Sequence, residues 1–222
     1  MATPRRRRSS RIGDATRERI LEAALEVFSE RGFDGATTRD IAARAATNLG
    51  LITYYFDSKE KLWRAAVDRV FGALAEVLAG ALPAEPDADA LARVVRELVR
   101  FAAHNPAFVR IMNDEGRRAG SRMRWLTDRH QKPLYEAVVA MLPQAAARGV
   151  LPDVPPIHLF YVLIGAVGMI FSQAPECERL TGTDPTSSDE AIEAHADAVV
   201  ALLLGGFTGR AATCRRKARP AR

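Results

Sequence analysis

Residues 37–56, with the sequence TTRDIAARAATNLGLITYYF, decide the fold because they predict two short helices joined by a tight turn. Either threonine at the start can cap a helix over 39–45, on which Ile41 points inward. A short break follows, and Asn48 is a good N-cap for a second short helix that runs to about Tyr55. Two helices with this spacing are typical of a helix-turn-helix, whose second helix enters the major groove of DNA.

The second of these helices would display several aromatic and aliphatic side chains over a very short span. Such a helix gains little by showing them to water, but a DNA groove offers thymine methyls to apolar groups and phosphates to hydroxyls. A simpler interpretation applies to the inward positions, which form the small core of a three-helix domain. These positions are Ile20, Ala24, Phe28, Ile41, Ala45, Ile52 and Phe56, with Tyr54 either partly in that core or on the surface.

Helices are also predicted on both sides of this stretch. Upstream, Asp14 or Thr16 can cap a helix that ends at Gly32, a residue suited to the left-handed position past a helix end. Downstream, Asp57 and Glu60 have the spacing of a capping box that opens a long helix to about residue 82.

The remainder of the chain predicts further helices and no strand pattern of any length, so the fold class is all-α, with about nine helices. The prolines mark its breaks, and 174–188 is expected to be a polar loop. The expected helices are 87–103, one from Pro106 through Met112, 121–147 with kinks near Pro133 and Pro143, 157–171, and one from Asp189 onward.

The charge of the chain is unevenly distributed. The chain has 222 residues and a net charge of +5. The arm 1–11 alone carries +5 and the tail 210–222 carries +6, and neither contains an acidic residue. Residues 12–209 are therefore net acidic, at −6, and the seven bases and nine acids of 12–63 leave that segment at −2. We expect a disordered basic arm and tail that add phosphate or minor-groove contacts, while specificity lies in the folded part.

Several classes of protein are disfavoured. The segment after Arg5–Arg8 is charged, so it has no apolar core of a secretion signal, and the apolar run 157–171 is shorter than the roughly 20 residues of a membrane helix. Two distant cysteines imply no disulfide framework and a cytoplasmic location. No phosphate-binding glycine loop, nucleophile elbow or metal-ligand spacing is present, so we expect no cofactor, no metal and no enzyme.

The run from Ala15 to Trp63 resembles the DNA-binding domain of the tetracycline-repressor (TetR) family of bacterial regulators. The matching residues are Ile20-Leu21-x-Ala23-Ala24-x-x-x-Phe28-x-x-x-Gly32-Phe33, Thr37-Thr38-Arg39-Asp40-Ile41-Ala42, Gly50, Tyr54-x-Phe56 and Ser58-Lys59-Glu60-x-Leu62. The resemblance implies a helical homodimeric repressor that binds a palindromic operator in double-stranded DNA. The expected domains are the arm 1–11, a DNA-binding domain over 12–63, a ligand-binding and dimerisation domain over 64–208, and the tail 209–222.

The same resemblance assigns DNA contacts residue by residue. They fall at the start of the first short helix, along the second, and just after it: Thr37, Thr38, Arg39, Thr47, Asn48, Leu49, Gly50, Thr53, Tyr54, Tyr55 and Lys59. The chain departs from the family pattern at Ala46, where glycine is usual, and at Leu49 and Thr53, which replace a frequent base and a frequent tyrosine. A left-handed residue at Ala46 would be strained, and the operator sequence stays open.

Two apolar helices, 157–171 and 191–207, are too hydrophobic all round for a monomer surface, and we expect them to form the dimer interface. The alternative is that they are central core helices. An effector pocket would lie between Leu91 and Met169, and its candidate lining residues are Phe108, Met112, Arg122, Trp125, Tyr135 and Met169.

A dense charged cluster lies in the same part of the chain: Arg110, Asp114, Glu115, Arg117, Arg118, Arg122 and Arg124. It would either receive the anionic head of a fatty-acyl or other hydrophobic effector or form a solvated surface of salt bridges. Three other functions stay open at this point. They are an architectural DNA binder without an effector, a metal sensor built from distant histidines, and a peripheral membrane protein.

Overall fold

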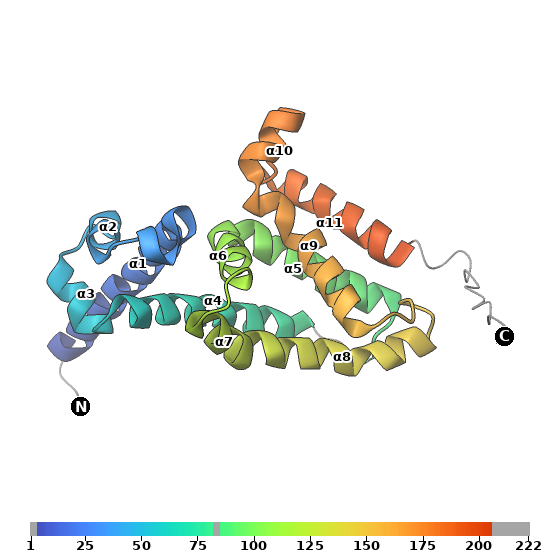
Figure 1. The fold of residues 1–222 in the computed structure, drawn as a ribbon, viewed down its shortest axis with the longest axis horizontal. Coiled ribbons are helices and arrows are strands. Elements are labelled where there is room, and N and C mark those ends of the chain that lie inside the picture. The colour runs from blue at the N-terminus through green and yellow to red at the C-terminus, as the bar shows by residue number, and fades with distance from the viewer. Residues whose placement is uncertain (1–3, 82–84, 206–222) are drawn as a thin grey trace, which may run out of the picture.

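The computed structural model describes residues 4–81 and 85–205, and this part of the chain contains helices and no strand. Figure 1 shows their arrangement. The α-helices are α1 Pro4–Gly35, α2 Thr38–Arg44, α3 Leu49–Phe56, α4 Lys59–Ala81, α5 Ala88–His104, α6 Pro106–Gly116, α7 Ser121–Leu126, α8 Lys132–Ala147, α9 Pro156–Ser172, α10 Ala174–Thr181 and α11 Asp189–Leu204, with a π-helical turn over Thr127–Gln131 between α7 and α8. The all-α prediction is confirmed, with more helices than the nine expected.

Helices α1–α3 gather at one end of the molecule, and α4 runs from them along the C-terminal helices (Figure 1). The first turns of α4 belong to the core of the helix-turn-helix unit, where Leu62 and Trp63 are buried beside Ile20, Phe28 and Ile41. Helix α6 packs against α1 and contributes Ile111 to the same core. The helix-turn-helix unit and the C-terminal domain therefore share one continuous hydrophobic core across α4 and α6.

The C-terminal domain has a second core between α5, α9 and α11, in which Val99, Phe171 and Ala196 are fully buried. Arg100 on α5 forms a two-pronged ion pair with Glu193 on α11, with Nε–Oε1 at 2.5 Å. This ion pair lowers the pKa of Glu193, chiefly through the hydrogen bond from Arg100. Helix α11 is thus fixed on α5 by both apolar and ionic contacts.

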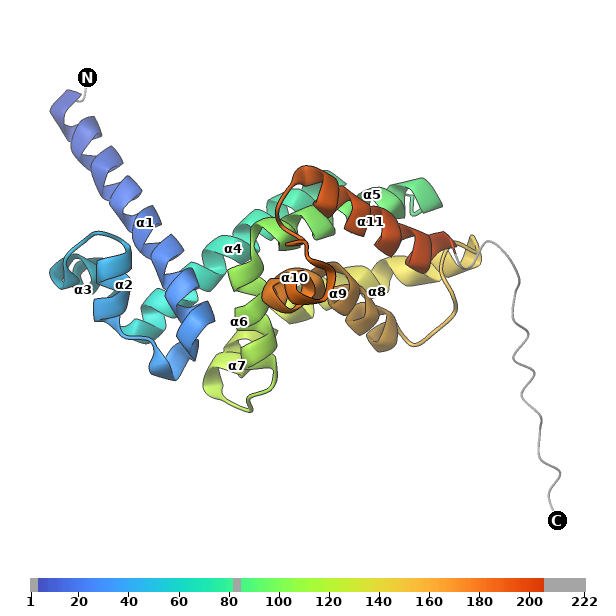
Figure 2. The ribbon, with the colours of Figure 1, turned by 90° about the horizontal axis from the view of Figure 1, so that it is seen from above.

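The N-terminal prediction is wrong in one respect. The helix expected to begin after Asp14 or Thr16 begins at Pro4, so the residues of the expected disordered arm from 4 to 11 are helical. Proline is favoured in a first helical turn, and the arginines that follow are good helix formers. Figure 2 shows these turns of α1 extending beyond α2 and α3. The expected tail 209–222 and the end of the expected helix 191–207 lie outside the described residues.

The segment 174–188, expected to be a loop, begins with the helix α10. Pro175 lies in its first turn, where no amide hydrogen is needed, and Gly182 ends it with φ 76° and ψ 8°. Helix α10 projects away from the other helices (Figure 1).

Among the described residues, no single helix is long and apolar enough to cross a bilayer, and only α9 and α10 taken together, bent by 73°, reach that length and composition.

Candidate functional site

The first helix of the helix-turn-helix begins as predicted. The Thr37 side chain accepts a hydrogen bond from the Asp40 amide at 3.1 Å, and Asp40 accepts one from the Thr37 amide at 3.2 Å. This capping box fixes the start of α2. The hydrogen bond from the Thr37 hydroxyl, together with Arg31 at 2.7 Å, lowers the pKa of Asp40. Asp40 is therefore held as a carboxylate by partners within the protein.

The turn between α2 and α3 contains the strained residue that the sequence suggested. Ala46 has φ 48°, a left-handed conformation that glycine adopts more readily. Asn48 then caps α3 as predicted, with its Oδ1 accepting from the Leu51 amide at 2.9 Å. A Cβ at Gly50 would lie 3.2 Å from that oxygen, so the missing side chain keeps the cap open.

One face of α3 is exposed and combines apolar and hydroxyl groups. Leu49, Thr53 and Tyr54 are exposed, Tyr54 at 77%, while Ile52 and Phe56 are buried. Leu49 lies one turn before Thr53, and Tyr54 follows Thr53 directly, so the three exposed side chains are neighbours on the helix surface. Tyr54 is thus on the surface and not in the core.

Tyr55 and Lys59 do not share this face. The Tyr55 hydroxyl donates to the Gly13 carbonyl at 3.2 Å and so ties α3 to α1. The Lys59 ammonium donates to the carbonyls of Phe33 and Ala36 at 2.9 and 3.0 Å, and it lies 4.6 Å from the centre of the Phe33 ring. The Tyr55 hydroxyl therefore has its partner in the first half of α1, and the Lys59 ammonium holds the C-terminal end of α1, so both groups have partners inside the protein.

Most bases of this unit are paired with acids. Arg44 donates to both Glu26 and Glu30 at 2.8 Å, and these hydrogen bonds raise the pKa of Arg44. Arg31 is paired with Asp40. Arg39 in α2, in contrast, is exposed and has no ion-pair partner among the described residues. Arg39 is thus a cation available to a DNA phosphate or base edge, although residues 12–63 are net negative.

The start of α4 differs from the expected capping box. Ser58, and not Asp57, accepts the hydrogen bond from the Lys61 amide, at 3.2 Å. Asp57 occupies the turn after α3 with φ 56°, and its carboxylate pairs with the Lys61 ammonium at 2.7 Å. Because Asp57 is needed in the turn, the next hydroxyl takes the cap.

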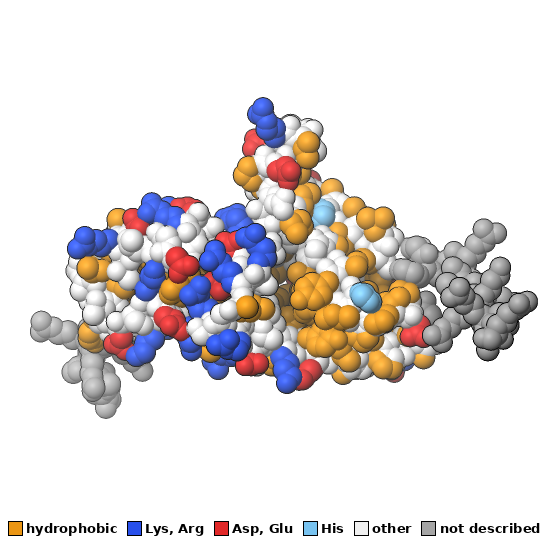
Figure 3. Space-filling view, viewed as in Figure 1, with side chains coloured by type: hydrophobic (Ala, Val, Ile, Leu, Met, Phe, Trp, Pro, Cys, Tyr) orange, Lys and Arg blue, Asp and Glu red, His pale blue; other side chains and the backbone are white. Residues whose placement is uncertain are grey.

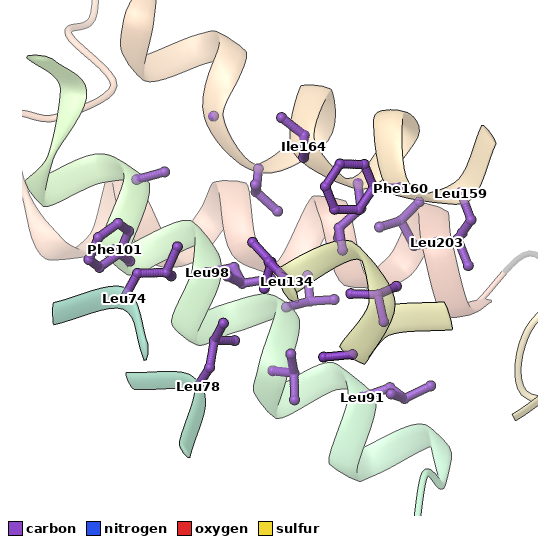
Figure 4. A pocket seen from close by; sticks show the side chains of 18 of the residues that line it. Leu74, Leu78, Leu91, Leu98, Phe101, Leu134, Leu159, Phe160, Ile164 and Leu203 are labelled. Carbon is purple, nitrogen blue, oxygen red and sulfur yellow. The ribbon is translucent and has the colours of Figure 1, made fainter. Parts of the chain in front are cut away.

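The C-terminal domain contains an apolar cavity of about 240 Å³. Figure 4 shows hydrocarbon side chains from several helices converging on it. Its wall is formed mainly by α4, α5, α6, α8 and α9, with contributions from α11 and from Leu151. The labelled members are Leu74, Leu78, Leu91, Leu98, Phe101, Leu134, Leu159, Phe160, Ile164 and Leu203. Asn113 and Gln131 are the polar side chains among the described lining residues.

The structure brings two of the six expected pocket residues into this wall, Phe108 and Met112, both on α6. Arg122 lies elsewhere: it pairs with Glu115 at 3.0 Å, and its guanidinium is 3.9 Å from the centre of the Phe33 ring. The other three are also outside the wall. Trp125 packs against Trp63, Tyr135 packs against Phe160 from outside the wall, and Met169 is 45% exposed.

The charged cluster of α6 and α7 is separate from the cavity. Arg117 pairs with Asp114, Arg118 pairs with Asp34 at 3.4 Å, and Arg122 pairs with Glu115. None of the cluster lines the cavity within the part of the chain that the structure describes. Mutual salt bridges thus account for it better than an anion-binding site inside the domain.

An exposed apolar face lies on α9 and extends to α11. Tyr161 is 66% exposed and Val162 54%, with Ile157 and Met169 on the same side, and Leu202 on α11 is 77% exposed. Figure 3 shows hydrophobic side chains gathered over the half of the molecule that holds α8 and α9, and charged ones over the other half. This face leaves large apolar side chains in water unless another surface covers them.

In residues 4–81 and 85–205, no three His, Cys, Asp or Glu side chains lie together as metal ligands would.

Residues 20–66 match the model described as bacterial regulatory proteins, tetR family, and residues 88–202 match the tetracyclin repressor-like C-terminal domain. The helix-turn-helix, the cavity-bearing helical domain and these two matches agree, and the chain belongs to the TetR family of bacterial regulators.

Several relatives are similar over different lengths. The chain is 35% identical over 113 residues to the HTH-type transcriptional repressor NicS of Pseudomonas putida, covering 48% of this chain and 51% of that protein. It is 27% identical over 172 residues to the repressor SCO4008 of Streptomyces coelicolor, covering 78% and 86%. The match to NicS thus spans about half the length of that relative.

Solved structures share the fold. AibR, in complex with isovaleryl coenzyme A and operator DNA, has a TM-score of 0.69 at 20% identity, covering 85% of this chain and 98% of that one. The ketosteroid transcriptional regulator KstR2 of Mycobacterium tuberculosis has a TM-score of 0.67 at 21% identity, covering 85% and 94%.

Proposed function

We propose that this protein is a homodimeric transcriptional repressor that a small hydrophobic or amphipathic effector releases from a palindromic operator. Similar proteins are named as repressors, as NicS is, and AibR was solved with an acyl coenzyme A and with operator DNA. The proposal places the protein in the cytoplasm, with double-stranded DNA and an effector as its partners.

The observation that carries the proposal is that the cavity and the helix-turn-helix share their supporting helices. On α4, Phe71 and Leu74 line the cavity, while Leu62 and Trp63 belong to the core of the DNA-binding unit. On α6, Phe108 belongs to both. An effector that moves these side chains moves the helices on which α1–α3 rest, because a packed core does not absorb such a shift.

DNA recognition is assigned to the exposed face of α3 and to the start of α2. Leu49, Thr53 and Tyr54 would face the major groove, and Thr37 and Arg39 would reach the adjacent backbone or base edges. Thr38, Thr47, Asn48 and Gly50 complete the proposed contact set. Two heads of a dimer would read half-sites about 34–36 Å apart. A small change in their separation then prevents both heads from binding at once.

The second copy is proposed to dock on the exposed face of α9 and α11. Gly165 lies on this side of α9, and Ala194, Ala198 and Ala201 are exposed on α11 next to Leu202. Small residues let two helices approach closely, and the large apolar residues between them supply the buried area. Gel filtration at micromolar concentration should give a dimer, and a monomer would refute this interface.

The experiment that tests the proposal is a footprint on the DNA that flanks the protein's own gene. A protected palindrome that disappears when a hydrophobic ligand is added is the expected result. Diffuse coating without a defined site would instead support an architectural DNA binder. A defined footprint that no cavity ligand changes would refute the effector-responsive mechanism.

A further inference from the structure

The wall of the cavity indicates what kind of molecule fits it. Its described side chains are hydrocarbon or thioether groups except for two, and neither of those two carries a charge. A charge inside such a wall would lose its water without gaining a partner, which costs several kcal/mol. The part of a ligand that enters the cavity is therefore uncharged and almost wholly apolar.

The volume of the cavity sets the size of that part. An engineered protein cavity of about 150 Å³ holds benzene, which has six carbons, so each carbon occupies about 25 Å³. By the same ratio, the 240 Å³ found here holds about ten carbon atoms. The leucines and phenylalanines labelled in Figure 4 all line this one cavity.

The two polar side chains of the wall are both within reach of solvent. Asn113 on α6 is exposed, and Gln131 at the end of the π-helical turn is half-buried. The Gln131 Oε1 accepts a bond from the Thr127 hydroxyl at 3.3 Å, which leaves its amide group free to donate. Amide side chains offer neutral donors and acceptors, which suit a carbonyl or a hydroxyl.

The cations near Asn113 and Gln131 are not placed to bind a charged group of a ligand. Arg117 and Arg122 are engaged by Asp114 and Glu115, the two acids that directly follow Asn113. Lys132, next to Gln131, is exposed and does not line the cavity. A carboxylate placed between Asn113 and Gln131 would thus meet two neutral amides, with acids nearby.

Building on the proposed function, we infer that the effector is a neutral amphiphile. Its apolar part has about ten carbons and fills the cavity. Its first polar group is uncharged, such as an ester, ketone or hydroxyl, and it hydrogen-bonds Asn113 and Gln131 at the cavity mouth.

Calorimetric titration of the full-length protein with methyl decanoate, 1-decanol and decanoate at pH 7.5 tests the class. Methyl decanoate and decanol should bind, with decanoate at least about tenfold weaker because its charge must stay solvated. A homologous series of methyl esters should tighten about fourfold per added methylene up to roughly ten carbons and then level off. Decanoate binding that equals ester binding, no binding by any of the three, or a steady gain up to sixteen carbons would each overturn the inference.

Matched variants locate the ligand. Ala137 and Ala140 are both exposed on α8, but only Ala137 lines the cavity. Ala137→Trp should therefore weaken ester binding at least about tenfold, while Ala140→Trp should change it less than twofold. Gln131→Leu should weaken it about fivefold through one lost hydrogen bond, whereas Gln144→Leu, on α8 and outside the cavity wall, should not. Equal effects within either pair would overturn the placement.

A second readout separates this inference from the proposed function. If the ester binds as described but leaves the operator footprint unchanged, the ligand class stands and effector-driven release fails. If the footprint responds to decanoate and not to the ester, release stands and the neutral class fails. Decanoate binding that is abolished by Lys132→Gln would show a charge recognised at the rim and would also overturn the neutral class.

Discussion

Replacing Arg122 with methionine should destabilise the protein more than any exposed arginine substitution would. Arg122 joins α7 to the junction of the two domains, where it pairs with Glu115 at 3.0 Å and lies over the Phe33 ring. The Glu115 side chain is 6% exposed and that of Arg122 19%. Without Arg122, the Glu115 carboxylate stays buried and uncompensated.

The size of the loss follows from this burial. Removing one partner of a buried pair costs about 3–5 kcal/mol, and 3 kcal/mol lowers the Tm of a chain of this length by roughly 6–12 °C. The matched control is Arg117→Met, because Arg117 is 76% exposed in its pair with Asp114. That variant should cost less than about 1 kcal/mol. The double variant Glu115→Gln/Arg122→Met should recover more than half of the loss, since no buried charge remains.

Urea unfolding followed by circular dichroism gives the free energy of unfolding of the wild type and the three variants, all at the same protomer concentration. A cost below about 1 kcal/mol for Arg122→Met, or a double variant no more stable than the single, would refute the reasoning. Either result would mean that the pair behaves like an exposed one and does not hold the junction.

The remaining predictions concern the turn, the DNA surface and a partly buried histidine. Ala46→Gly should raise stability by up to about 1 kcal/mol, because glycine relieves the φ of 48°, and a lower Tm would contradict this. Tyr54→Ala should weaken operator binding with an unchanged Tm, and Arg39→Gln should also reduce the slope of log K against log salt by about one, so an unchanged slope would remove Arg39 from the phosphate contacts. Burial lowers the pKa of His130, although its 2.8 Å contact with Asp68 partly opposes this. Its contribution to stability is thus full above a pH of about 6.5 and is lost as the pH falls towards the lowered pKa, where the unfolded chain takes up the proton first. His130→Asn should flatten that decline in a series of melts, and an unchanged pH profile would contradict the assignment.

Short-range features of the fold could be predicted from the sequence. Thr37 and Asn48 cap helices through bonds to amides three residues on, so the residue type and its place before an apolar period are enough. Asp57 shows the limit of this reasoning, because the turn after α3 competes for it and Ser58 takes the cap. Helix α10 was missed because a polar composition alone does not distinguish a loop from a short exposed helix.

Contacts between distant segments could not be predicted in the same way. Tyr55 and Lys59 hydrogen-bond to carbonyls more than 20 residues away, on α1 and just after it. Whether these two side chains point into the protein or towards solvent therefore depends on how α1 packs. The cavity wall draws Leu74, Leu98 and Phe160 from three helices. Each of these residues follows an ordinary helical period, and only the tertiary arrangement separates a core leucine from one that lines a cavity.

The most direct test of the central claim is operator affinity measured by fluorescence anisotropy with and without a saturating cavity ligand. Because α4 and α6 carry both the cavity wall and the core of the helix-turn-helix, methyl decanoate should weaken operator binding by roughly 5–150-fold, the usual range of coupling between two sites. Ala137→Trp should bind the operator normally and lose this response. Operator affinity that is the same with the cavity occupied and unoccupied would contradict the account.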